Sequence, residues 1–357
     1  MKKIISFVLG VCMTLSVGAG LTGCDKQEKE REFKNVILVI GDGMGENHIL
    51  NTITYFDMEN PSFMADQKGY IGTNSLSGTT DSAAGGTALA TGNKVQNGEI
   101  AQLSGEKLEQ ITTIAQNASM KTGVITTDTL DGATPAAFSA HASSRNFTNQ
   151  IINTQASSNV DLMMGRWSSD YTNRSYVFEE KGYTIAENEE ELLAAKDSQK
   201  LIGLMGNINS QYLPGCEEHY QLKEMTQFAV EYLENENGFF LMIEGAYIDK
   251  HSHNNDLYKM MCEMRSLIDT IDYLYEYATD GETAVFITAD HETGSLLKGD
   301  DKDEMENFLY GSKDHSATPV PIFVKNYVWK PENFGYSVGA TPENTMVFEA
   351  CKAIINP

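Results

Sequence analysis

The sequence predicts an α/β fold, a three-layer α/β/α sandwich with a mostly parallel central sheet. Five short apolar runs, rich in Val, Ile or Phe and flanked by glycine or polar residues, have the composition of buried parallel strands. They lie at residues 36–40, 122–126, 239–243, 284–288 and 320–324. Segments with helical periodicity alternate with these runs, which is typical of helices packed on both faces of a parallel sheet.

Two segments show the helical spacing, residues 107–118 and residues 257–277. In the second, apolar residues recur at helical spacing at Leu257, Met261, Met264, Ile268, Ile271 and Tyr275. Such a stripe predicts a helix packed against the core, and we interpret its methionines as core residues rather than as a binding surface.

The chain begins with the pattern of an exported lipoprotein. Two lysines precede an apolar run over residues 4–19, and a lipobox with the sequence LTGC ends at Cys24. The run is too short for a comfortable membrane span, although an uncleaved anchor is the alternative. We expect residues 1–23 to be a signal peptide and Cys24 to carry lipid. The mature protein is then exported and anchored to a bacterial membrane, facing the periplasm or the cell surface.

The rest of the chain predicts a tether and one domain. Residues 24–35 are mostly charged or polar and predict a flexible tether, and residues 36–357 predict a single domain. The segments at about 146–236 and 294–314 are interpreted as peripheral insertions. The formal charge of −24 becomes −26 once the two signal lysines are removed, and such an acidic protein is not expected to bind nucleic acid.

Three cysteines lie outside the signal peptide and the lipobox: Cys216, Cys262 and Cys351. Their spacing contains no CxxC pair and no disulfide framework. An oxidising compartment permits one bridge among them, which leaves at least one thiol unpaired.

A glycine-rich turn, GDGMG at residues 41–45, follows the first predicted strand. Its glycines permit a sharp turn and a close approach to a ligand. Asp42 lies at the carboxyl end of the strand, where open α/β sheets bind ligands. The spacing fits neither a dinucleotide fingerprint nor a Walker A loop, and an ordinary turn is the alternative.

Ser82 lies in the sequence TTDSAAGGTA at residues 79–88. The small residues after it allow a helix to pack closely beneath it. Ser82 would then lie at a helix start, where outward-facing N–H groups attract an anion. The alternative is that Ser82 or Asp81 is only the N-cap of that helix.

Acidic and histidine residues accompany the later strands. Asp249 and His253 are four residues apart, which places them on one face of a helix. Asp290 and His291 follow the next strand, and His315 precedes the last one. Because the carboxyl ends of parallel strands share one edge of a sheet, these groups are expected to converge. Mixed carboxylate and imidazole ligands suit zinc, and two such sets suit a two-metal centre.

Taken in order, these motifs resemble those of the alkaline phosphatase family. The resemblance spans nearly the whole mature chain through residues 40–45, 80–84, 90–92, 133–137, 141–145, 244–250, 288–291 and His315. It implies an alkaline-phosphatase-like fold and a metal-dependent hydrolase of small phosphate monoesters. The reaction implied passes through a phosphoserine and releases inorganic phosphate.

The resemblance also implies a role for each matched residue. Two zinc ions are expected, one on Asp249, His253 and His315 and the other on Asp42, Asp290 and His291. A third metal, magnesium, is expected on Asp42, Thr134 and Glu244. The remaining roles are Ser82 as nucleophile, Arg145 as a bidentate clamp on phosphate and Lys250 as a phosphate contact through water.

One position departs from the family pattern. Two residues before Thr134 the family commonly has Asp or His, whereas this chain has Gly132. Asp131, one place earlier, is the candidate substitute if the loop shifts by one residue. His141 falls in a matched segment and is interpreted as structural.

Other functions remain open at this point. A phosphodiesterase or nucleotide pyrophosphatase of the same superfamily would share most metal ligands, but those enzymes typically carry Thr as nucleophile and lack the segment around Arg145. A sulfatase would need a C/S-x-P-x-R setting that Ser82 does not have. A lipoprotein that binds phosphate or metal without turnover is the non-enzymatic alternative. The family is often dimeric, so a homodimer is a further expectation.

Overall fold

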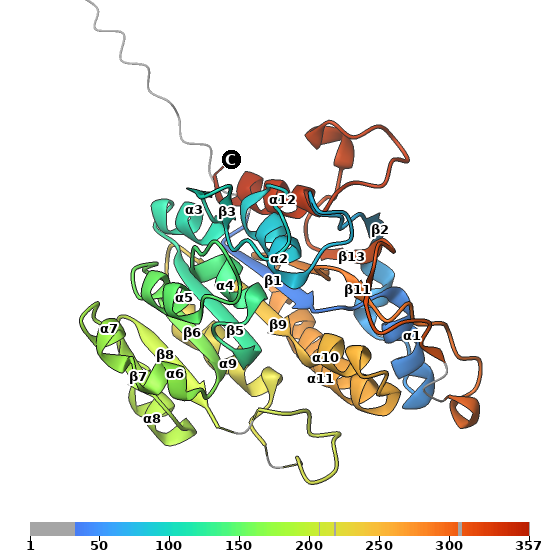
Figure 1. The fold of residues 1–357 in the computed structure, drawn as a ribbon, viewed down its shortest axis with the longest axis horizontal. Helices are drawn as coiled ribbons and strands as arrows, with labels where there is room; N and C mark the ends of the chain where they lie inside the picture. The colour runs from blue at the N-terminus through green and yellow to red at the C-terminus, as the bar shows by residue number, and fades with distance from the viewer. Residues whose placement is uncertain (1–32, 207, 218, 306–308, 357) are drawn as a thin grey trace, which may run out of the picture. The chain divides into compact units, whose positions relative to one another are not determined.

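A nine-stranded sheet forms the centre of the computed structural model, in the order β2-β13-β10-β1-β9-β5-β6-β8-β7 (Figure 1). The structure describes residues 33–356 except 207, 218 and 306–308. The predicted signal peptide, Cys24 and most of the predicted tether therefore lie outside the described residues. The sheet strands are β1 (Asn35–Gly41), β2 (Gln67–Ile71), β5 (Lys121–Thr129), β6 (Leu162–Arg166), β7 (Thr184–Ala186), β8 (Leu201–Met205), β9 (Phe239–Gly245), β10 (Thr283–Thr288) and β13 (Val320–Lys325).

Seven neighbouring strands, from β10 to β7, pair in parallel. The four strands predicted at 36–40, 122–126, 239–243 and 284–288 are β1, β5, β9 and β10, so these predictions are confirmed. The direction predicted for 320–324 is wrong, because β13 runs antiparallel to β10 and to β2. The short antiparallel pair β11 (Glu292–Thr293) and β12 (His315–Ser316) returns the chain to the carboxyl edge of β10. The next strand must then run the other way.

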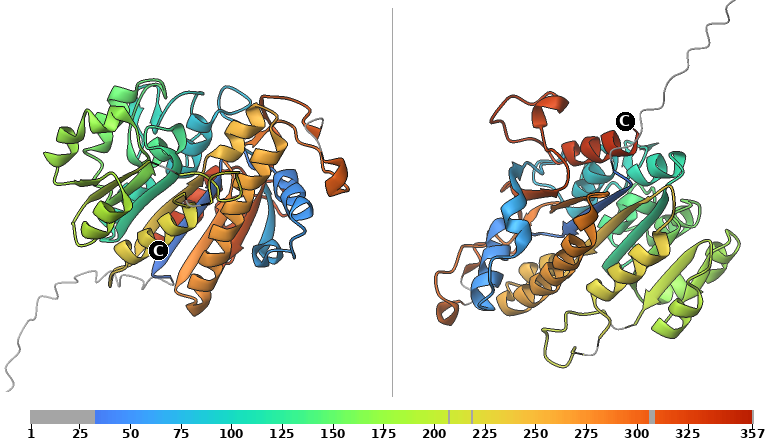
Figure 2. Two further views of the ribbon diagram at one scale, coloured as in Figure 1. Left: turned by 90° about the horizontal axis from the view of Figure 1, so that it is seen from below. Right: turned by 180° about the vertical axis from the view of Figure 1, so that it is seen from behind.

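Helices cover both faces of the sheet (Figures 1 and 2). One layer contains α2 (Ser82–Thr91), α3 (Ile111–Asn117), α4 (Ala133–Ser139), α5 (Thr148–Gln155) and α12 (Thr345–Ile355). In this layer α2 contacts α3, α4 and α12, and α4 contacts α5. The other contains α1 (Glu46–Tyr55), α9 (Leu222–Leu233), α10 (Tyr247–His253) and α11 (Leu257–Tyr277), with α11 in contact with the other three. The predicted three-layer sandwich is therefore confirmed.

The helix predicted at 257–277 matches α11, and all six residues of its predicted stripe are buried. The helix predicted at 107–118 begins later, at Ile111. Lys107 instead belongs to a small hairpin of β3 (Gln102–Leu103) and β4 (Glu106–Lys107). Ser104 and Gly105 make its turn with φ values of 53° and 90°. The hairpin takes the first residue that the periodicity assigned to the helix, and residues 108–110 connect the two elements.

The segment at about 146–236 extends one end of the sheet rather than standing outside it. It supplies β6, β7 and β8 with their connecting short helices α6 (Ser169–Thr172), α7 (Ser175–Glu179) and α8 (Glu189–Ala194). Short 3-10 turns complete the fold at η1 (Ser62–Asp66), η2 (Ala278–Asp280), η3 (Lys302–Glu304) and η5 (Pro331–Phe334). Within the described part of the chain, no helix has the length and apolar character needed to span a membrane. The three cysteines there are free.

Candidate active site

The first group of site residues lies where β1 and β10 end side by side. Asp42 directly follows β1, and Asp290 and His291 follow β10, whose Thr288 is paired with Ile40 of β1. Nε2 of His291 lies 3.4 Å from Oδ1 of Asp42 and 3.3 Å from Oδ2 of Asp290. These three residues, expected to share a zinc ion, are brought close enough to hold one ion.

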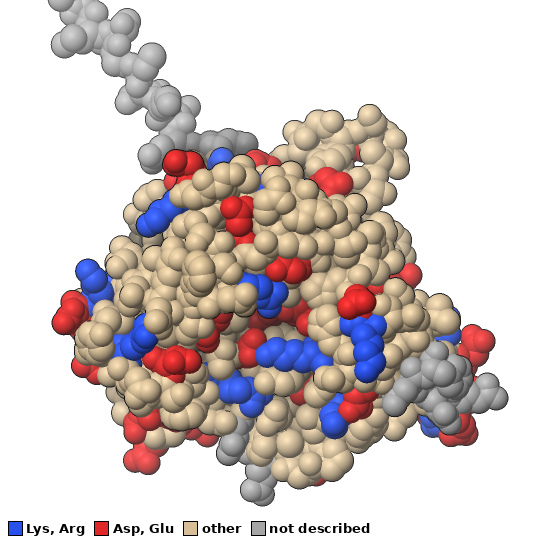
Figure 3. Space-filling model, viewed as in Figure 1, with Lys and Arg blue, Asp and Glu red and all other residues tan. Residues whose placement is uncertain are grey.

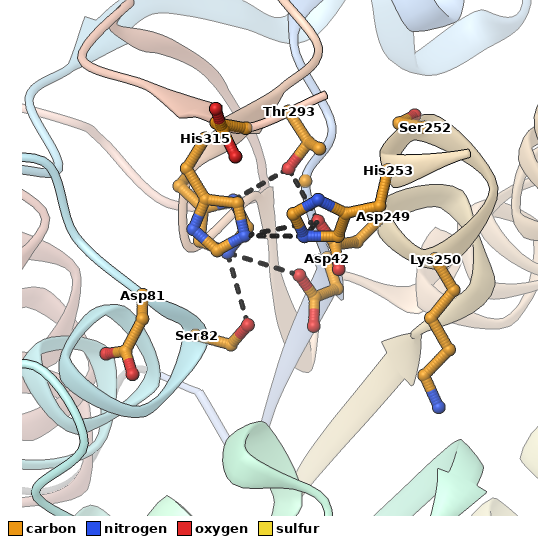
Figure 4. A network of polar contacts seen from close by, with 12 residues as sticks. Asp42, Asp81, Ser82, Asp249, Lys250, Ser252, His253, Thr293 and His315 are labelled. Carbon is orange, nitrogen blue, oxygen red and sulfur yellow. Dashed lines mark hydrogen bonds and ion pairs between the residues drawn. The ribbon is translucent and has the colours of Figure 1, made fainter. Parts of the chain in front are cut away.

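The second group lies on α10 and β12. Asp249 and His253 face the same side of α10, with Nε2 of His253 3.3 Å from Oδ1 of Asp249. Nε2 of His315 lies 3.5 Å from the same Asp249 oxygen and 3.0 Å from Nε2 of His253 (Figure 4). The predicted helical spacing of Asp249 and His253 is confirmed. His315 reaches the site because β12 pairs with β11, not because it follows a parallel strand.

The two groups of side chains are in direct contact with each other. The imidazole rings of His291 and His315 stack with their centroids 3.6 Å apart. The buried hydroxyl of Thr293 donates to Oδ1 of Asp249 at 2.5 Å and lies 3.2 Å from Nδ1 of His291. One hydroxyl therefore contacts a member of each group. If Nδ1 of His291 carries the proton and donates to Thr293, Nε2 keeps its lone pair toward Asp42 and Asp290.

The charge balance of the first group fits bound cations. Oδ1 of Asp42 and Oδ2 of Asp290 are buried and have no hydrogen-bond partner. Burial, together with the charge of Asp249, raises the pKa of Asp290 to about 8. Burial and Asp290 raise the pKa of Asp42 well above its ordinary value, and burial and His315 lower that of His291. Two buried carboxylates with unpartnered oxygens beside a buried imidazole are a donor set that fits a metal ion.

Ser82 is the first residue of α2 and is buried. Its Oγ lies 3.2 Å from Nε2 of His291. Asp81 caps the helix instead, since its side chain accepts a hydrogen bond from the N–H of Ala84 at 3.0 Å. The serine hydroxyl is thus directed at the metal-ligand group (Figure 4). The close packing expected beneath Ser82 also occurs, because a Cβ on Gly85 would lie 2.8 Å from the backbone oxygen of Asp290.

Arg145 is held beside the start of α2. Nη1 of its guanidinium lies 3.5 Å from Oδ2 of Asp81. Its backbone N–H donates a hydrogen bond to the backbone oxygen of Gly98. The side chain is 37% exposed, so the guanidinium can still bind a ligand. Figure 3 shows basic side chains around a hollow whose floor is acidic, on the face where β9 and α10 meet. Asp81, which both caps α2 and holds Arg145, was not identified as an anchor of Arg145 from the sequence.

The predicted third metal site lies at the carboxyl end of β9. Glu244 is paired in the sheet with Ile40 and Thr126, and its carboxylate accepts a hydrogen bond from the hydroxyl of Thr126. Burial, and then the charge of Asp128, raises the pKa of Glu244 to about 7. The Thr134 hydroxyl is buried without a hydrogen-bond partner, although it lies close enough to lower the pKa of Glu244.

Asp131, the candidate substitute at Gly132, has one carboxylate oxygen buried without a hydrogen-bond partner. Its Oδ2 accepts a hydrogen bond from the hydroxyl of Thr148, at the start of α5. The carboxylate of Asp128 also lies against Gly132, and it forms an ion pair with Lys250. No motif in the sequence marks Asp128, so it was not predicted as a site residue. His141 contacts the backbone oxygen of Leu108 at 3.0 Å, in agreement with a structural role.

The fold and this site define a class: a hydrolase with an α/β/α sandwich fold that would use metal ions and a serine nucleophile. The family model for alkaline phosphatase matches residues 33–164 and 154–348. Alkaline phosphatase 4 of Bacillus subtilis is 32% identical over 322 residues, covering 83% of this chain and 67% of that protein. Alkaline phosphatase of Escherichia coli K12 is 28% identical over 346 residues, covering 76% and 73%.

A solved structure gives the same result. Alkaline phosphatase from the Antarctic bacterium TAB5 is 28% identical, with a TM-score of 0.77 over 92% of this chain and 99% of that one. A mutant of that enzyme, His 135 Glu, has magnesium bound in its M3 site, and its TM-score is 0.78 at 27% identity over the same shares of the two chains. The chain belongs to the alkaline phosphatase family, and it is a phosphate monoester hydrolase.

Proposed function

We propose that this protein hydrolyses phosphate monoesters through a phosphoserine on Ser82, at a centre of two zinc ions with a third, magnesium site. One observation carries the proposal. The Ser82 hydroxyl lies 3.2 Å from His291, which is common to the two groups of side chains close enough to hold an ion. These groups are Asp42, Asp290 and His291, and Asp249, His291 and His315. A serine that only capped its helix would have no reason to lie there, since Asp81 already caps α2.

The residues divide between the metals as the resemblance implies. Asp42, Asp290 and His291 would hold one zinc, and Asp249, His253 and His315 the other. Asp42, Glu244 and Thr134 would hold magnesium, a cation that prefers oxygen ligands. When bound, such ions lower the pKa of a coordinated hydroxyl or water and neutralise charge on the phosphoryl oxygens.

The chain's own groups position the reaction. The deprotonated Oγ of Ser82 forms a bond to phosphorus while the bond from phosphorus to the ester oxygen breaks, and that oxygen leaves with the electron pair. Water then attacks the phosphoserine from the opposite side, which restores the serine hydroxyl and releases inorganic phosphate. Arg145 binds two phosphoryl oxygens, and the carboxylate of Asp81 orients its guanidinium. This work is mainly positioning and charge stabilisation.

The test compares two substrates on zinc- and magnesium-loaded protein. Hydrolysis of p-nitrophenyl phosphate should be far faster than that of bis-p-nitrophenyl phosphate. Arg145 favours this outcome, because a monoester offers its guanidinium more free oxygens than a diester does. A preference for the diester would support the phosphodiesterase alternative, and metal binding without turnover of either ester would support the binding protein.

We also propose that the protein is exported and anchored to a bacterial membrane by lipid on Cys24, facing the periplasm or the cell surface. The sequence pattern alone supports this, because Cys24 lies outside the described residues. Metabolic labelling with a fatty acid should mark the wild-type protein and not the Cys24→Ser variant. A homodimer is proposed from the family alone, and a monomeric mass by analytical ultracentrifugation would exclude it.

A further inference from the structure

Gly132, the N-cap residue of α4, lies where neighbouring atoms leave little room for a side chain. Its φ of −51° and ψ of 148° are open to any residue, so the backbone does not require glycine. A Cβ at this position, however, would lie 2.8 Å from Oδ2 of Asp128 and 3.0 Å from the backbone oxygen of Thr129. The first distance is shorter than Cβ contacts reach and the second is tighter than most of them, so the Asp128 carboxylate would have to shift. Gly132 therefore makes room for the carboxylate of Asp128, four residues earlier in the chain.

Asp128 is fixed in that space by both its ends. Its N–H donates to the Thr126 hydroxyl at 2.9 Å, and the same hydroxyl donates to Glu244. Its carboxylate forms an ion pair with Lys250, which directly follows Asp249 in α10. The Asp128 side chain is only 19% exposed. It is thus connected through Thr126 to one predicted magnesium ligand and through Lys250 to the helix that carries two predicted zinc ligands.

The surroundings of Asp128 call for a further cation. The Thr126 hydroxyl contacts both Glu244 and the N–H of Asp128, and Lys250 forms its ion pair with Asp128. Among the described residues no ion pair is made to Glu244. Thr134, 1% exposed, directs an unpartnered hydroxyl into the same group beside Glu244. An excess of negative charge with only oxygen donors suits Mg²⁺, which keeps several of its own waters and uses few protein ligands.

We propose that Asp128 provides the acidic group which the loop lacks at Gly132, so that it orients Lys250 and faces the Mg²⁺ of the third site. Asp128 and Gly132 form a matched pair, since a side chain at residue 132 would displace this carboxylate from its position. The inference rests on the proposed function, which supplies the third metal site. Asp128 is a positioning residue, because nothing places it in contact with the phosphate.

The test moves the carboxylate from one position to the other. Protein loaded with zinc is titrated with Mg²⁺ by calorimetry, and bound metals are counted by mass spectrometry after gel filtration. Asp128→Ala should weaken Mg²⁺ binding by about tenfold or more while zinc content stays constant. The double variant Asp128→Ala/Gly132→Asp should restore most of the affinity. Gly132→Ala should weaken Mg²⁺ binding in the same direction, because its methyl group displaces Asp128.

A matched control is available in the same loop. Asp131→Asn removes an acidic group one residue from Gly132 and should leave Mg²⁺ affinity within about threefold of the wild type, because Asp131 turns toward Thr148. Thermal unfolding of each variant distinguishes a local effect from a folding defect.

Several outcomes would overturn the proposal. They are unchanged Mg²⁺ affinity in Asp128→Ala, no recovery in the folded double variant, a loss in Asp131→Asn equal to that in Asp128→Ala, or no Mg²⁺ binding by the wild type. The titration needs no turnover, so its failure is distinguishable from failure of the proposed function, which the two-substrate assay tests separately.

Discussion

The group formed by Asp42, Asp290 and His291 and the carboxylate of Asp128 are held by the fold in different ways. Asp42, Asp290 and His291 lie one to three residues beyond strands that pair in unbroken register, with Ile40 of β1 opposite Thr288 of β10. Asp128 lies near the end of β5, where the pairing with β6 shifts between Ile125 and Thr129. Regular strand ends fix a side chain in one place, whereas an irregular strand end lets a carboxylate be supplied from a different sequence position.

The largest expected effect comes from moving a strand-end ligand by one residue. Asp290→Ala should lose the zinc held by Asp42 and His291 and lower kcat by about 10³-fold or more. In Asp290→Ala/Ala289→Asp the carboxylate returns one residue earlier, at a fully buried position directly after β10, so zinc should not return. Metal counting and steady-state kinetics measure both effects. If zinc binding recovered in this double variant, a ligand at a regular strand end could be moved as freely as the carboxylate at Asp128 and Gly132, and the contrast would be wrong.

Arg145 is a third case, because it lies in a loop and its position depends on Asp81, the N-cap residue of α2. Arg145→Ala should lower kcat/KM by about 10²- to 10³-fold and weaken inhibition by phosphate, through loss of two charge-assisted hydrogen bonds. Zinc content should not change. Arg145→Lys keeps the charge without the fork and should recover only part of the activity. Equal phosphate inhibition in wild type and Arg145→Ala would contradict this assignment.

Thr293 tests whether the two zinc groups act as one unit. Thr293→Val keeps the shape of the side chain but removes the hydroxyl that contacts Asp249 and His291. Zinc affinity should fall by about 10- to 100-fold at both sites, measured by competition with a chelator. Thr293→Ser should restore it. The control is Thr270→Val, a buried threonine whose hydroxyl bonds only Ser266, and it should leave zinc affinity unchanged. Loss at one site alone would show that Thr293 does not couple them.

A buried carboxylate outside the site should affect stability and not activity. Glu263 of α11 accepts a hydrogen bond from the N–H of Ser210, and burial raises its pKa to about 7. Its folded state holds a proton more tightly than its unfolded state, so its contribution to stability is complete below about pH 4.5 and is lost as pH rises through 7. Glu263→Gln should cancel this loss, on the order of 3 kcal/mol at pH 8, without changing activity. Denaturant unfolding of both proteins at pH 5 and pH 8 measures the difference. An equal pH dependence in the two proteins would contradict the prediction.

The same contrast explains what the sequence could predict. Strands β1, β5, β9 and β10 and helix α11 follow from local composition and periodicity, and ligand convergence follows from strand ends. The direction of β13 depends on the return through β11 and β12, which pair Thr293 with His315 across the intervening loop. The strands β6 and β8 are short, and no site motif follows them in the chain. Asp128 could not be found because its place depends on the register shift in β5 and on empty space at Gly132.

Phosphoenzyme formation tests the central claim most directly. The metal-loaded protein is incubated with a labelled phosphate monoester, quenched in acid and digested, and the labelled peptide is sequenced by mass spectrometry. The account predicts one phosphate, on Ser82, and no label in Ser82→Ala despite a full complement of zinc. Label on another residue, or full activity of Ser82→Ala, would contradict it.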